Sequence, residues 1–512
     1  MSDPDLPAAT GHDASVTEDP TDRRLADHPL TAARLDRHRE ILSSSGYPYR
    51  YDRSATAADL HARFADIAPG HQTAERVSVA GRLMNVRDMG RLAFGVLQDG
   101  TGRIQLYAEA GSLGEDGLHR FLELDHGDLI GAEGEVMTTR RGELSVRIDR
   151  FDLLAKALRP LPEKWHGLQD TELRSRRRYL DLIVNEDARK VALARTRIVS
   201  ELRRQFEARG YIEVETPVLL TQATGALARP FETDHHALAM GMQLRIATEL
   251  YLKRLIIGGL EKVYEIGRIF RNEGIDATHN PEFTMLESYE AYADYGDIAT
   301  LVEEVFSATA AASAGSTTIS YQGRPLDLTP PYPRARLVDM VADAVLQPID
   351  FSAPIEDLRD LARRHGIEPQ PHWLHGKIAE ELFDALVADS IWEPTFVVDH
   401  PKEVSPLARV HRTDPNLTER FELFIAGHEY ANAFSELNDP LDQRARFEAQ
   451  ASARLGGDDE AHPVDEDFLT ALEYGMPPTG GLGIGVDRLV MLLTDRRHIR
   501  EVILFPTLRP ER

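Results

Sequence analysis

The sequence predicts an α+β protein in which a small β-barrel precedes a larger domain that mixes strands and helices. Residues 77–154 contain short segments of alternating apolar and polar residues, separated by glycine-containing turns, a pattern typical of strands. An apolar stripe at helical spacing predicts an amphipathic helix over 196–208. Two strand-like runs within 421–436, joined at an Ala-Gly pair, predict an antiparallel hairpin.

The strands of the expected barrel are clearly marked. Their segments are 77–83, 93–99, 103–107 and 143–148, and five such strands make a small barrel of a kind that binds nucleic acid. Phe94 is a candidate stacking platform for an unpaired base. Gln105 and Glu143 are expected to read base edges, and Arg87 to lie near phosphate. The alternative, with Phe94 in the barrel core, stays open because about half of a strand's residues face inward.

Two arginines far apart in the sequence predict a site for ATP. Arg271 lies in the string Phe-Arg-Asn-Glu, and Arg488 ends the glycine-rich run 481–488. A triphosphate needs fixed positive charge as its leaving group departs, and a guanidinium supplies that charge. We assign both arginines as catalytic and expect Phe283 to stack on adenine opposite Arg488. The expected ATP-binding set is Arg271, Glu273, His279, Phe283, Glu422, Glu429 and Arg488.

A simpler interpretation of these two short motifs stays open at this point. Arg271 and Glu273 would also suit a surface ion pair, and the glycines of 481–485 would also suit a tight turn.

Glu422 and Glu429 flank the predicted turn at Ala426-Gly427. On two antiparallel strands joined there, the two carboxylates are expected to face one another across the ladder. Facing carboxylates repel unless a cation lies between them, and beside an ATP site the natural candidate is Mg²⁺. Both residues are therefore predicted metal ligands. The alternative is a solvated hairpin with both acids outward, which the apolar neighbours disfavour.

Several strings resemble those of a known family. The string Gly-Tyr-Ile-Glu-Val-Glu-Thr-Pro at 210–217 resembles class II synthetase motif 1, 270–273 resembles motif 2, and 483–488 resembles motif 3. With the strings 156–162 and 228–231, the chain resembles the bacterial class II lysyl-tRNA synthetases from residue 31 onward. The resemblance implies a class II antiparallel sheet flanked by helices, preceded by an OB-fold that reads the lysine anticodon.

The resemblance also implies an amino-acid site. Glu249 and Glu287 are expected to take the α-ammonium of L-lysine, and Tyr289 and Glu436 the ε-ammonium. An acidic pocket suits such a ligand, because buried carboxylates without a cation are unfavourable. The implied lysine-binding set is Gly225, Ala226, Glu249, Arg271, Glu287, Tyr289, Asn432, Phe434 and Glu436.

The resemblance further implies a homodimer, built by the 196–208 helix and the strand that ends at Pro217. The stripe of that helix, Ile198, Leu202 and Phe206, would equally suit an ordinary core contact. The expected domains are a disordered tail (1–30), a helical segment (31–75), the OB-fold (76–155), a linker (156–190) and the catalytic domain (191–512).

Composition sets limits on these expectations. The chain has 512 residues and no cysteine, which excludes thiol chemistry and disulfides. Its formal net charge of −25 argues against indiscriminate nucleic-acid binding. No apolar run reaches membrane-spanning length and the start is no signal peptide, so we expect a cytoplasmic protein.

The leading hypothesis is a ligase that forms lysyl-adenylate from lysine and ATP and charges the 3′ end of tRNA(Lys). One alternative is a duplicated paralogue that activates lysine or an analogue for another acceptor. Another is a tRNA-binding protein without catalysis, against which the arginines and glutamates of the expected site argue. An aspartyl or asparaginyl enzyme would share the architecture, but Glu287 and Glu436 suit an ammonium substrate.

Overall fold

The computed structural model describes residues 29–162, 168–222, 224–225, 228–455 and 464–510. The chain divides into two compact units, Met1–Gly167 and Leu168–Arg512, and this division falls within the expected linker. The expected tail lies outside the described residues up to residue 28, as does Ala226 of the expected lysine site.

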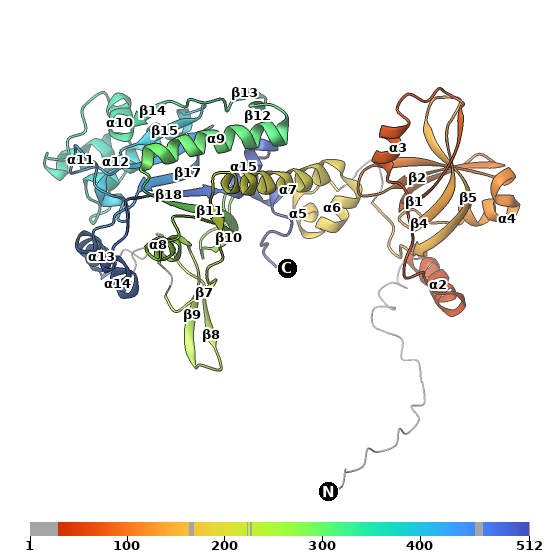
Figure 1. Ribbon diagram of the computed structural model, residues 1–512, viewed down its shortest axis with the longest axis horizontal. Helices are drawn as coiled ribbons and strands as arrows, with labels where there is room; N and C mark the ends of the chain where they lie inside the picture. The colour runs from red at the N-terminus through yellow and green to blue at the C-terminus, as the bar shows by residue number, and fades with distance from the viewer. Residues whose placement is uncertain (1–28, 163–167, 223, 226–227, 456–463, 511–512) are drawn as a thin grey trace, which may run out of the picture. The chain divides into compact units, whose positions relative to one another are not determined.

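The first unit contains a closed barrel of five strands in the order β1-β2-β3-β5-β4 (Figure 1). The strands are β1 (Gln72–Asp88), β2 (Leu92–Gln98), β3 (Arg103–Glu109), β4 (Leu129–Thr138) and β5 (Leu144–Ala155). Burial alternates along β2, where Ala93 and Leu97 enter the core and Phe94 stays half-buried. The predicted barrel is confirmed, and Phe94 lies outside its core.

Three helices accompany the barrel: α2 (Pro29–Ser44), α3 (Ala57–Arg63) and α4 (Ala110–Leu122). Thr56 caps α3 through its side chain, which accepts a hydrogen bond from the Asp59 N–H. The ring of Phe121 on α4 is fully buried against β2. A Cβ at Gly95 would lie 2.9 Å from that ring, so the close approach of helix and strand requires glycine there.

The second unit is built on an eight-stranded sheet in the order β14-β15-β16-β17-β18-β11-β10-β6. In that order the strands are β14 (Arg334–Arg336), β15 (Thr395–Val398), β16 (Arg420–Ile425), β17 (His428–Ser435), β18 (Thr479–Gly485), β11 (Glu282–Ala291), β10 (Lys262–Phe270) and β6 (Ile212–Glu213). The six central strands pair antiparallel, and the outermost strand at each end pairs parallel. This is the antiparallel sheet that the sequence resemblance implied.

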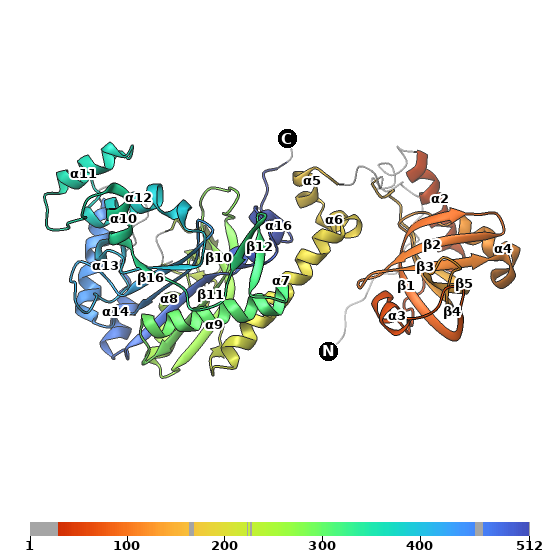
Figure 2. The same ribbon diagram turned by 90° about the horizontal axis from the view of Figure 1, so that it is seen from above.

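Three helices build the main core with this sheet: α7 (Glu186–Glu207), α9 (Tyr295–Ala314) and α15 (Val486–Leu493). Helices α7 and α9 lie side by side (Figure 2). The predicted stripe of Ile198, Leu202 and Phe206 is fully buried in this core. The helix is therefore confirmed, and its apolar stripe makes an ordinary core contact within the chain.

Two further groups of helices have hydrophobic cores beside the main one. Helices α10 (Leu337–Val345), α11 (Ile355–Arg364) and α12 (His375–Leu386) share a core of their own. Helices α8 (Glu249–Ile257), α13 (Pro440–Leu455) and α14 (Glu466–Glu473) pack together with Tyr289 of β11. The remaining helices are α5 (Thr171–Arg176), α6 (Arg178–Val184) and α16 (Ile499–Val502).

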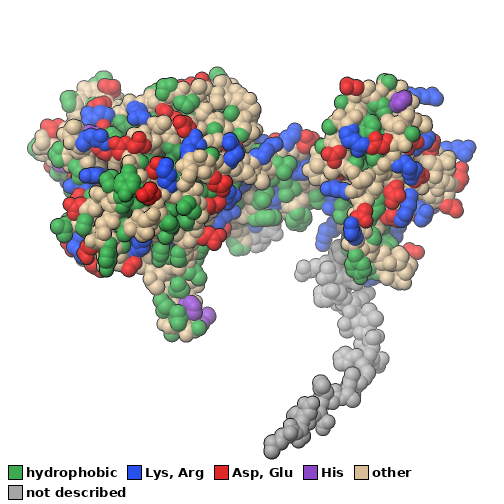
Figure 3. All heavy atoms as spheres, viewed as in Figure 1, with side chains coloured by type: hydrophobic (Ala, Val, Ile, Leu, Met, Phe, Trp, Pro, Cys, Tyr) green, Lys and Arg blue, Asp and Glu red, His purple; other side chains and the backbone are tan. Residues whose placement is uncertain are grey.

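Two small sheets complete the second unit. They are the hairpin β12 (Thr318–Tyr321) with β13 (Arg324–Asp327), and the three strands β7 (Leu219–Leu220), β9 (Met240–Leu244) and β8 (Glu232–His235). Histidine and apolar side chains gather at the projecting tip between β8 and β9 (Figure 3), where Leu238 is 65% exposed. In the part of the chain that the structure describes, no helix has the length and apolar character needed to cross a membrane.

Candidate active site

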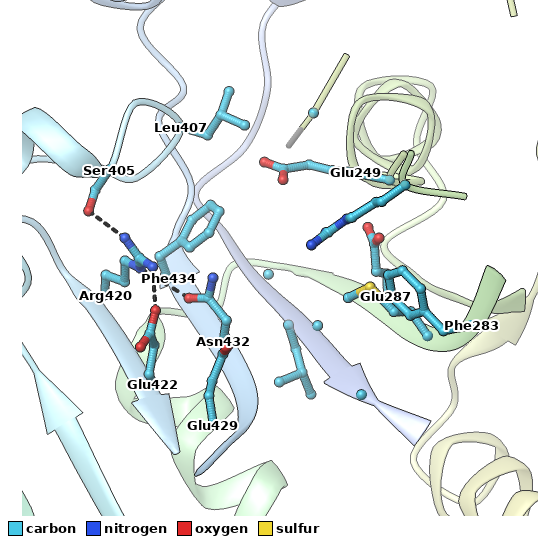
Figure 4. A pocket seen from close by; sticks show the side chains of 18 of the residues that line it. Glu249, Phe283, Glu287, Ser405, Leu407, Arg420, Glu422, Glu429, Asn432 and Phe434 are labelled. Carbon is cyan, nitrogen blue, oxygen red and sulfur yellow. Dashed lines mark hydrogen bonds and ion pairs between the residues drawn. The ribbon is translucent and has the colours of Figure 1, made fainter. Parts of the chain in front are cut away.

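A cavity of about 460 Å³ lies over the centre of the large sheet. Every described residue that the sequence assigned to ATP, lysine or metal lines this cavity: Gly225, Glu249, Arg271, Glu273, His279, Phe283, Glu287, Tyr289, Glu422, Glu429, Asn432, Phe434, Glu436 and Arg488. Figure 4 shows two groups of acids facing each other across it, Glu249 and Glu287 on one side and Glu422 and Glu429 on the other. Segments more than 200 residues apart in the sequence thus meet in one site.

The floor of the cavity follows from the strand register. Strand β18 lies between β11 and β17, so that Gly483 is paired with Glu287 on one side and Asn432 on the other. Gly481 likewise lies between Tyr289 and Phe434. A Cβ at Gly481 would overlap Oε1 of Glu436 and lie 2.7 Å from the Tyr289 ring. The alternating glycines therefore leave room for these side chains, and the tight-turn interpretation does not apply.

The two predicted catalytic arginines both line the cavity. Nη1 of Arg488 donates to the backbone carbonyl of Glu429 at 2.8 Å, and Nη2 lies 3.1 Å from Nε2 of His279. The guanidinium carbon of Arg271 lies 5.3 Å from the ring centre of Phe283. Burial lowers the pKa of Arg271, although a guanidinium stays charged in proteins. Arg271 lines the cavity and is half-buried, so the interpretation as a surface ion pair with Glu273 does not fit.

The predicted hairpin is confirmed, but the predicted pairing of its two glutamates is wrong. Strands β16 and β17 join at Ala426 and Gly427, both with positive φ. A register shift after Leu423 pairs Glu422 with Asn432, whereas Glu429 is opposite Phe424. The position of the turn is the reason, because strands that pair outward from it place Glu429 opposite Phe424. The extra residue on β17 shifts only the pairs from Leu423 to Arg420. Both carboxylates nevertheless line the cavity.

Arg420 is the cation paired with Glu422, and the sequence pattern did not indicate it. Its guanidinium forms an ion pair with Glu422 and donates to Oδ1 of Asn432 at 3.1 Å. Nη1 of Arg488, in contrast, lies 3.6 Å from Oε2 of Glu429. Burial raises the pKa of Glu422, and Arg420 opposes that rise. Burial also raises the pKa of Glu429, and the charge of Glu422 adds to it. The raised pKa values indicate that additional positive charge would be favourable beside these two carboxylates.

Glu422 and Glu429 are the side chains of the cavity that the sequence assigned to Mg²⁺. Among the described residues no group of three or more acidic or histidine side chains could hold a metal ion alone. Mg²⁺ needs only one or two protein carboxylates when phosphate oxygens and water supply its other ligands. Glu422 and Glu429 fit that requirement, because both are cavity-lining carboxylates whose pKa burial raises.

The opposite end of the cavity is lined by three buried carboxylates, Glu249, Glu287 and Glu436. Oε1 of Glu287 accepts the backbone N–H of Thr248 at 3.1 Å, and burial raises the pKa of Glu287 to about 7. Oε2 of Glu436 contacts Nζ of Lys253, whereas Oε1 of Glu436 has no hydrogen-bond partner. Such buried acceptors are unfavourable without a ligand, which indicates that this end of the cavity binds cationic groups.

Two further charged residues escaped the sequence patterns. Lys253 lies one helical turn after Glu249 on α8 and forms ion pairs with Glu249 and Glu436. The spacing of four residues was a signal for the first of these pairs. Asp487 accepts the backbone N–H of Thr284 at 2.6 Å and pairs with Arg195, which fixes the start of α15 beside Arg488.

The predicted anticodon residues lie on neighbouring strands of the barrel. Arg87 of β1, Phe94 of β2 and Tyr107 of β3 form one cross-strand row. Phe94 and Tyr107 meet edge to face, with 5.6 Å between ring centres. Gln105 lies in the next row, where it accepts the Ser145 hydroxyl at 2.9 Å. Glu143 is exposed just before β5. The structure thus gathers these side chains on one face.

Comparisons with known proteins agree with this architecture. The family described as tRNA synthetases class II (D, K and N) matches residues 170–509, and the OB-fold nucleic acid binding domain matches 77–154. The chain is 50% identical over 490 residues to a lysine–tRNA ligase of Moorella thermoacetica, which covers 95% of this chain and 99% of that protein. It belongs to the lysine–tRNA ligase family of class II tRNA synthetases.

Other members of the lysine–tRNA ligase family show the same extent of similarity. The ligase of Thermosynechococcus vestitus is 51% identical over 492 residues, or 94% of this chain and 97% of that protein. The ligase of Enterococcus faecalis is 52% identical over 465 residues, or 90% and 93%. Both units of this family member, the barrel and the catalytic sheet, therefore have counterparts in these ligases.

Proposed function

We propose that the chain activates L-lysine with ATP to form lysyl-adenylate and transfers the lysyl group to the 3′ end of tRNA(Lys). The observation that carries this proposal is the cavity with guanidinium groups at one end and three buried carboxylates at the other. A triphosphate suits the first end and the two ammonium groups of lysine suit the second.

Each end of the cavity has a part in the first step. Glu249 and Glu287 bind the α-ammonium with help from Gly225, while Tyr289 and Glu436 bind the ε-ammonium. Arg271 orients the lysine carboxylate toward the α-phosphorus. The carboxylate is already ionised and attacks in line: a new P–O bond forms, the bond from the α-phosphorus to the bridging oxygen breaks, and pyrophosphate leaves. No general base is required.

The chain's own charges stabilise the departing pyrophosphate. Arg488 and His279 lie together at the phosphate end, and preorganised positive charge is effective there because it needs no rearrangement during the reaction. Phe283 and Arg488 provide flat surfaces for adenine. When bound at Glu422 and Glu429, Mg²⁺ would neutralise part of the phosphate charge.

The second step uses both units of the chain. The terminal 3′-hydroxyl of tRNA attacks the mixed anhydride, which releases AMP and leaves lysine esterified to the tRNA. The barrel face with Arg87, Phe94, Gln105 and Glu143 binds the anticodon, where unpaired bases can stack on an aromatic ring.

The protein is also proposed to act as a homodimer in the cytoplasm, where tRNA is charged. The sheet ends at the two-residue strand β6, in which Ile212 is 52% exposed. A sheet edge with an exposed apolar side chain suits pairing with a second copy.

Charging of purified tRNA(Lys) with radiolabelled lysine tests the proposed function. We expect ATP-dependent formation of an acid-precipitable, alkali-labile ester. A duplicated paralogue that serves another acceptor would form lysyl-adenylate but leave tRNA uncharged, so measuring both steps separates the two candidates.

A further inference from the structure

Lys253 is a fully buried cation at the amino-acid end of the cavity, and the reaction steps above do not use it. Its Nζ lies 2.5 Å from Oε1 of Glu249 and also contacts Oε2 of Glu436. These two carboxylates belong to the two proposed ammonium sites. One side chain therefore links the group that binds the α-ammonium to the group that binds the ε-ammonium.

Aromatic rings enclose the same ammonium. Nζ of Lys253 lies 5.4 Å from the ring centre of Phe434, 5.9 Å from that of Phe468 and 6.0 Å from that of Tyr289. Rings at this distance favour a cation and exclude water. The side chain is thus held in one place, since its methylene groups and its charge both have partners.

We propose that Lys253 is a positioning residue that matches the charge of the pocket to the two ammonium groups of lysine, an inference that rests on the proposed function. The three carboxylates Glu249, Glu287 and Glu436 would carry three negative charges. The positive charge of Lys253 reduces the net charge of the pocket to minus two. The two ammonium groups of the substrate then neutralise the pocket. The substrate carboxylate is neutralised separately by Arg271.

Without Lys253, a third buried negative charge would have no partner. Because an unpaired buried charge is strongly unfavourable, one of the glutamates would retain a proton instead. A protonated carboxyl is a poor partner for an ammonium group. Burial raises the pKa of Glu436, and Lys253 opposes that rise. Burial lowers the pKa of Lys253 itself, but the two glutamates outweigh this and keep it raised.

Other charged and titratable groups near Lys253, Glu249 and Glu436 also influence how lysine binding depends on pH. They are Glu287 and Tyr289 on β11, Arg420 on β16 and Arg271 after β10. None of them changes in the variants below, so a difference between variants reports on position 253.

The test compares Lys253→Met, which removes the charge at similar length, with Lys253→Arg, which keeps it. Lysine-dependent pyrophosphate exchange gives KM for lysine and KM for ATP as functions of pH. We expect Lys253→Met to raise KM for lysine by about tenfold or more at neutral pH and to change KM for ATP by less than about twofold. The inflection of the lysine profile should move up by about one to three pH units. Lys253→Arg should keep the wild-type inflection.

Three results would overturn the inference: an unchanged lysine KM and inflection, an equal rise in both KM values, or a lower KM for lysine. The last would mean that Lys253 competes with the substrate. Circular dichroism checks folding, and Lys253→Gln replaces the methionine variant if that variant does not fold. Wild-type protein is assayed first. If the wild-type protein does not catalyse exchange with lysine, the proposed function fails. If the wild type is active and Lys253→Met or Lys253→Gln has the same lysine KM and pH profile, only this inference is refuted.

Discussion

Nη1 of Arg488 donates a 2.8 Å hydrogen bond to the backbone carbonyl of Glu429. This bond joins the first turn of α15 to the β16–β17 hairpin, so the glycine-rich strand and the hairpin that carries Glu422 and Glu429 hold one guanidinium between them. A charge fixed before ATP arrives stabilises the transition state without the free-energy cost of reorganisation.

Replacing either catalytic arginine should therefore abolish adenylate formation without unfolding the protein. We expect Arg271→Ala and Arg488→Ala each to lower the rate of pyrophosphate exchange by about 10²-fold or more, measured beside thermal unfolding. Arg363→Ala, which changes an arginine of α11 paired with Asp360, is the matched control. Exchange within a few-fold of wild type for the site variants would remove both arginines from the mechanism.

Glu422 and Glu429 should set the magnesium requirement. Glutamine at 422 and 429 keeps the side-chain shape but loses the charge, so the double variant should need a higher Mg²⁺ concentration for half-maximal exchange. The exposed Glu393→Gln on the same unit serves as a control. If the Mg²⁺ titration of the double variant overlaps that of wild type, the two residues are ordinary hairpin acids.

Lysine binding should depend on pH through Glu287. Burial raises the pKa of Glu287 to about 7 from its ordinary value of 4.5, so between these pH values the folded protein holds a proton that the unfolded chain releases. This bound proton contributes fully to the free energy of unfolding below pH 4.5, and the contribution is lost as pH rises through about 7. An ammonium needs the ionised carboxylate, so KM for lysine should fall as pH rises from about 6 to about 8. Glu287→Gln should abolish that inflection; a persistent inflection would assign it to another group.

Anticodon binding should be separable from adenylate chemistry. Phe94→Ala is expected to weaken tRNA charging by about 1–3 kcal/mol, the loss of one stacked base, while lysine-dependent exchange stays unchanged. Val96→Ala, two residues further along the same face of β2, controls for general damage to the barrel. Equal loss of both activities in Phe94→Ala would assign Phe94 a structural role.

The sequence predicted the elements of this site better than their contacts. The positions of Arg271, Glu287 and Arg488 follow from local strings, and alternation along the strands was enough for the barrel. The register of β16 and β17 did not follow, because one extra residue in β17 shifts the pairing without any glycine or proline to mark it.

The missed cations have a similar explanation. Arg420 and Lys253 acquire their roles from residues on other elements, Asn432 and Glu436 respectively. A local pattern contains no information on such long-range pairs. The sequence showed only two local spacings, the i,i+4 spacing of Glu249 and Lys253 and the i,i+2 spacing of Arg420 and Glu422.

The central claim is that the acidic end of the cavity selects an amino acid with two ammonium groups. Its most direct test is pyrophosphate exchange with lysine, ornithine, norleucine and the other standard amino acids, at saturating ATP and Mg²⁺. Lysine should be by far the best substrate. Ornithine should lose about 1–3 kcal/mol from the missing methylene, together with any hydrogen bonding lost through its shorter reach. Norleucine should be rejected more strongly, because it offers no second ammonium group to the buried Glu436 carboxylate. Exchange with norleucine, or with a branched lysine analogue, at a rate equal to or above that with lysine would contradict the account.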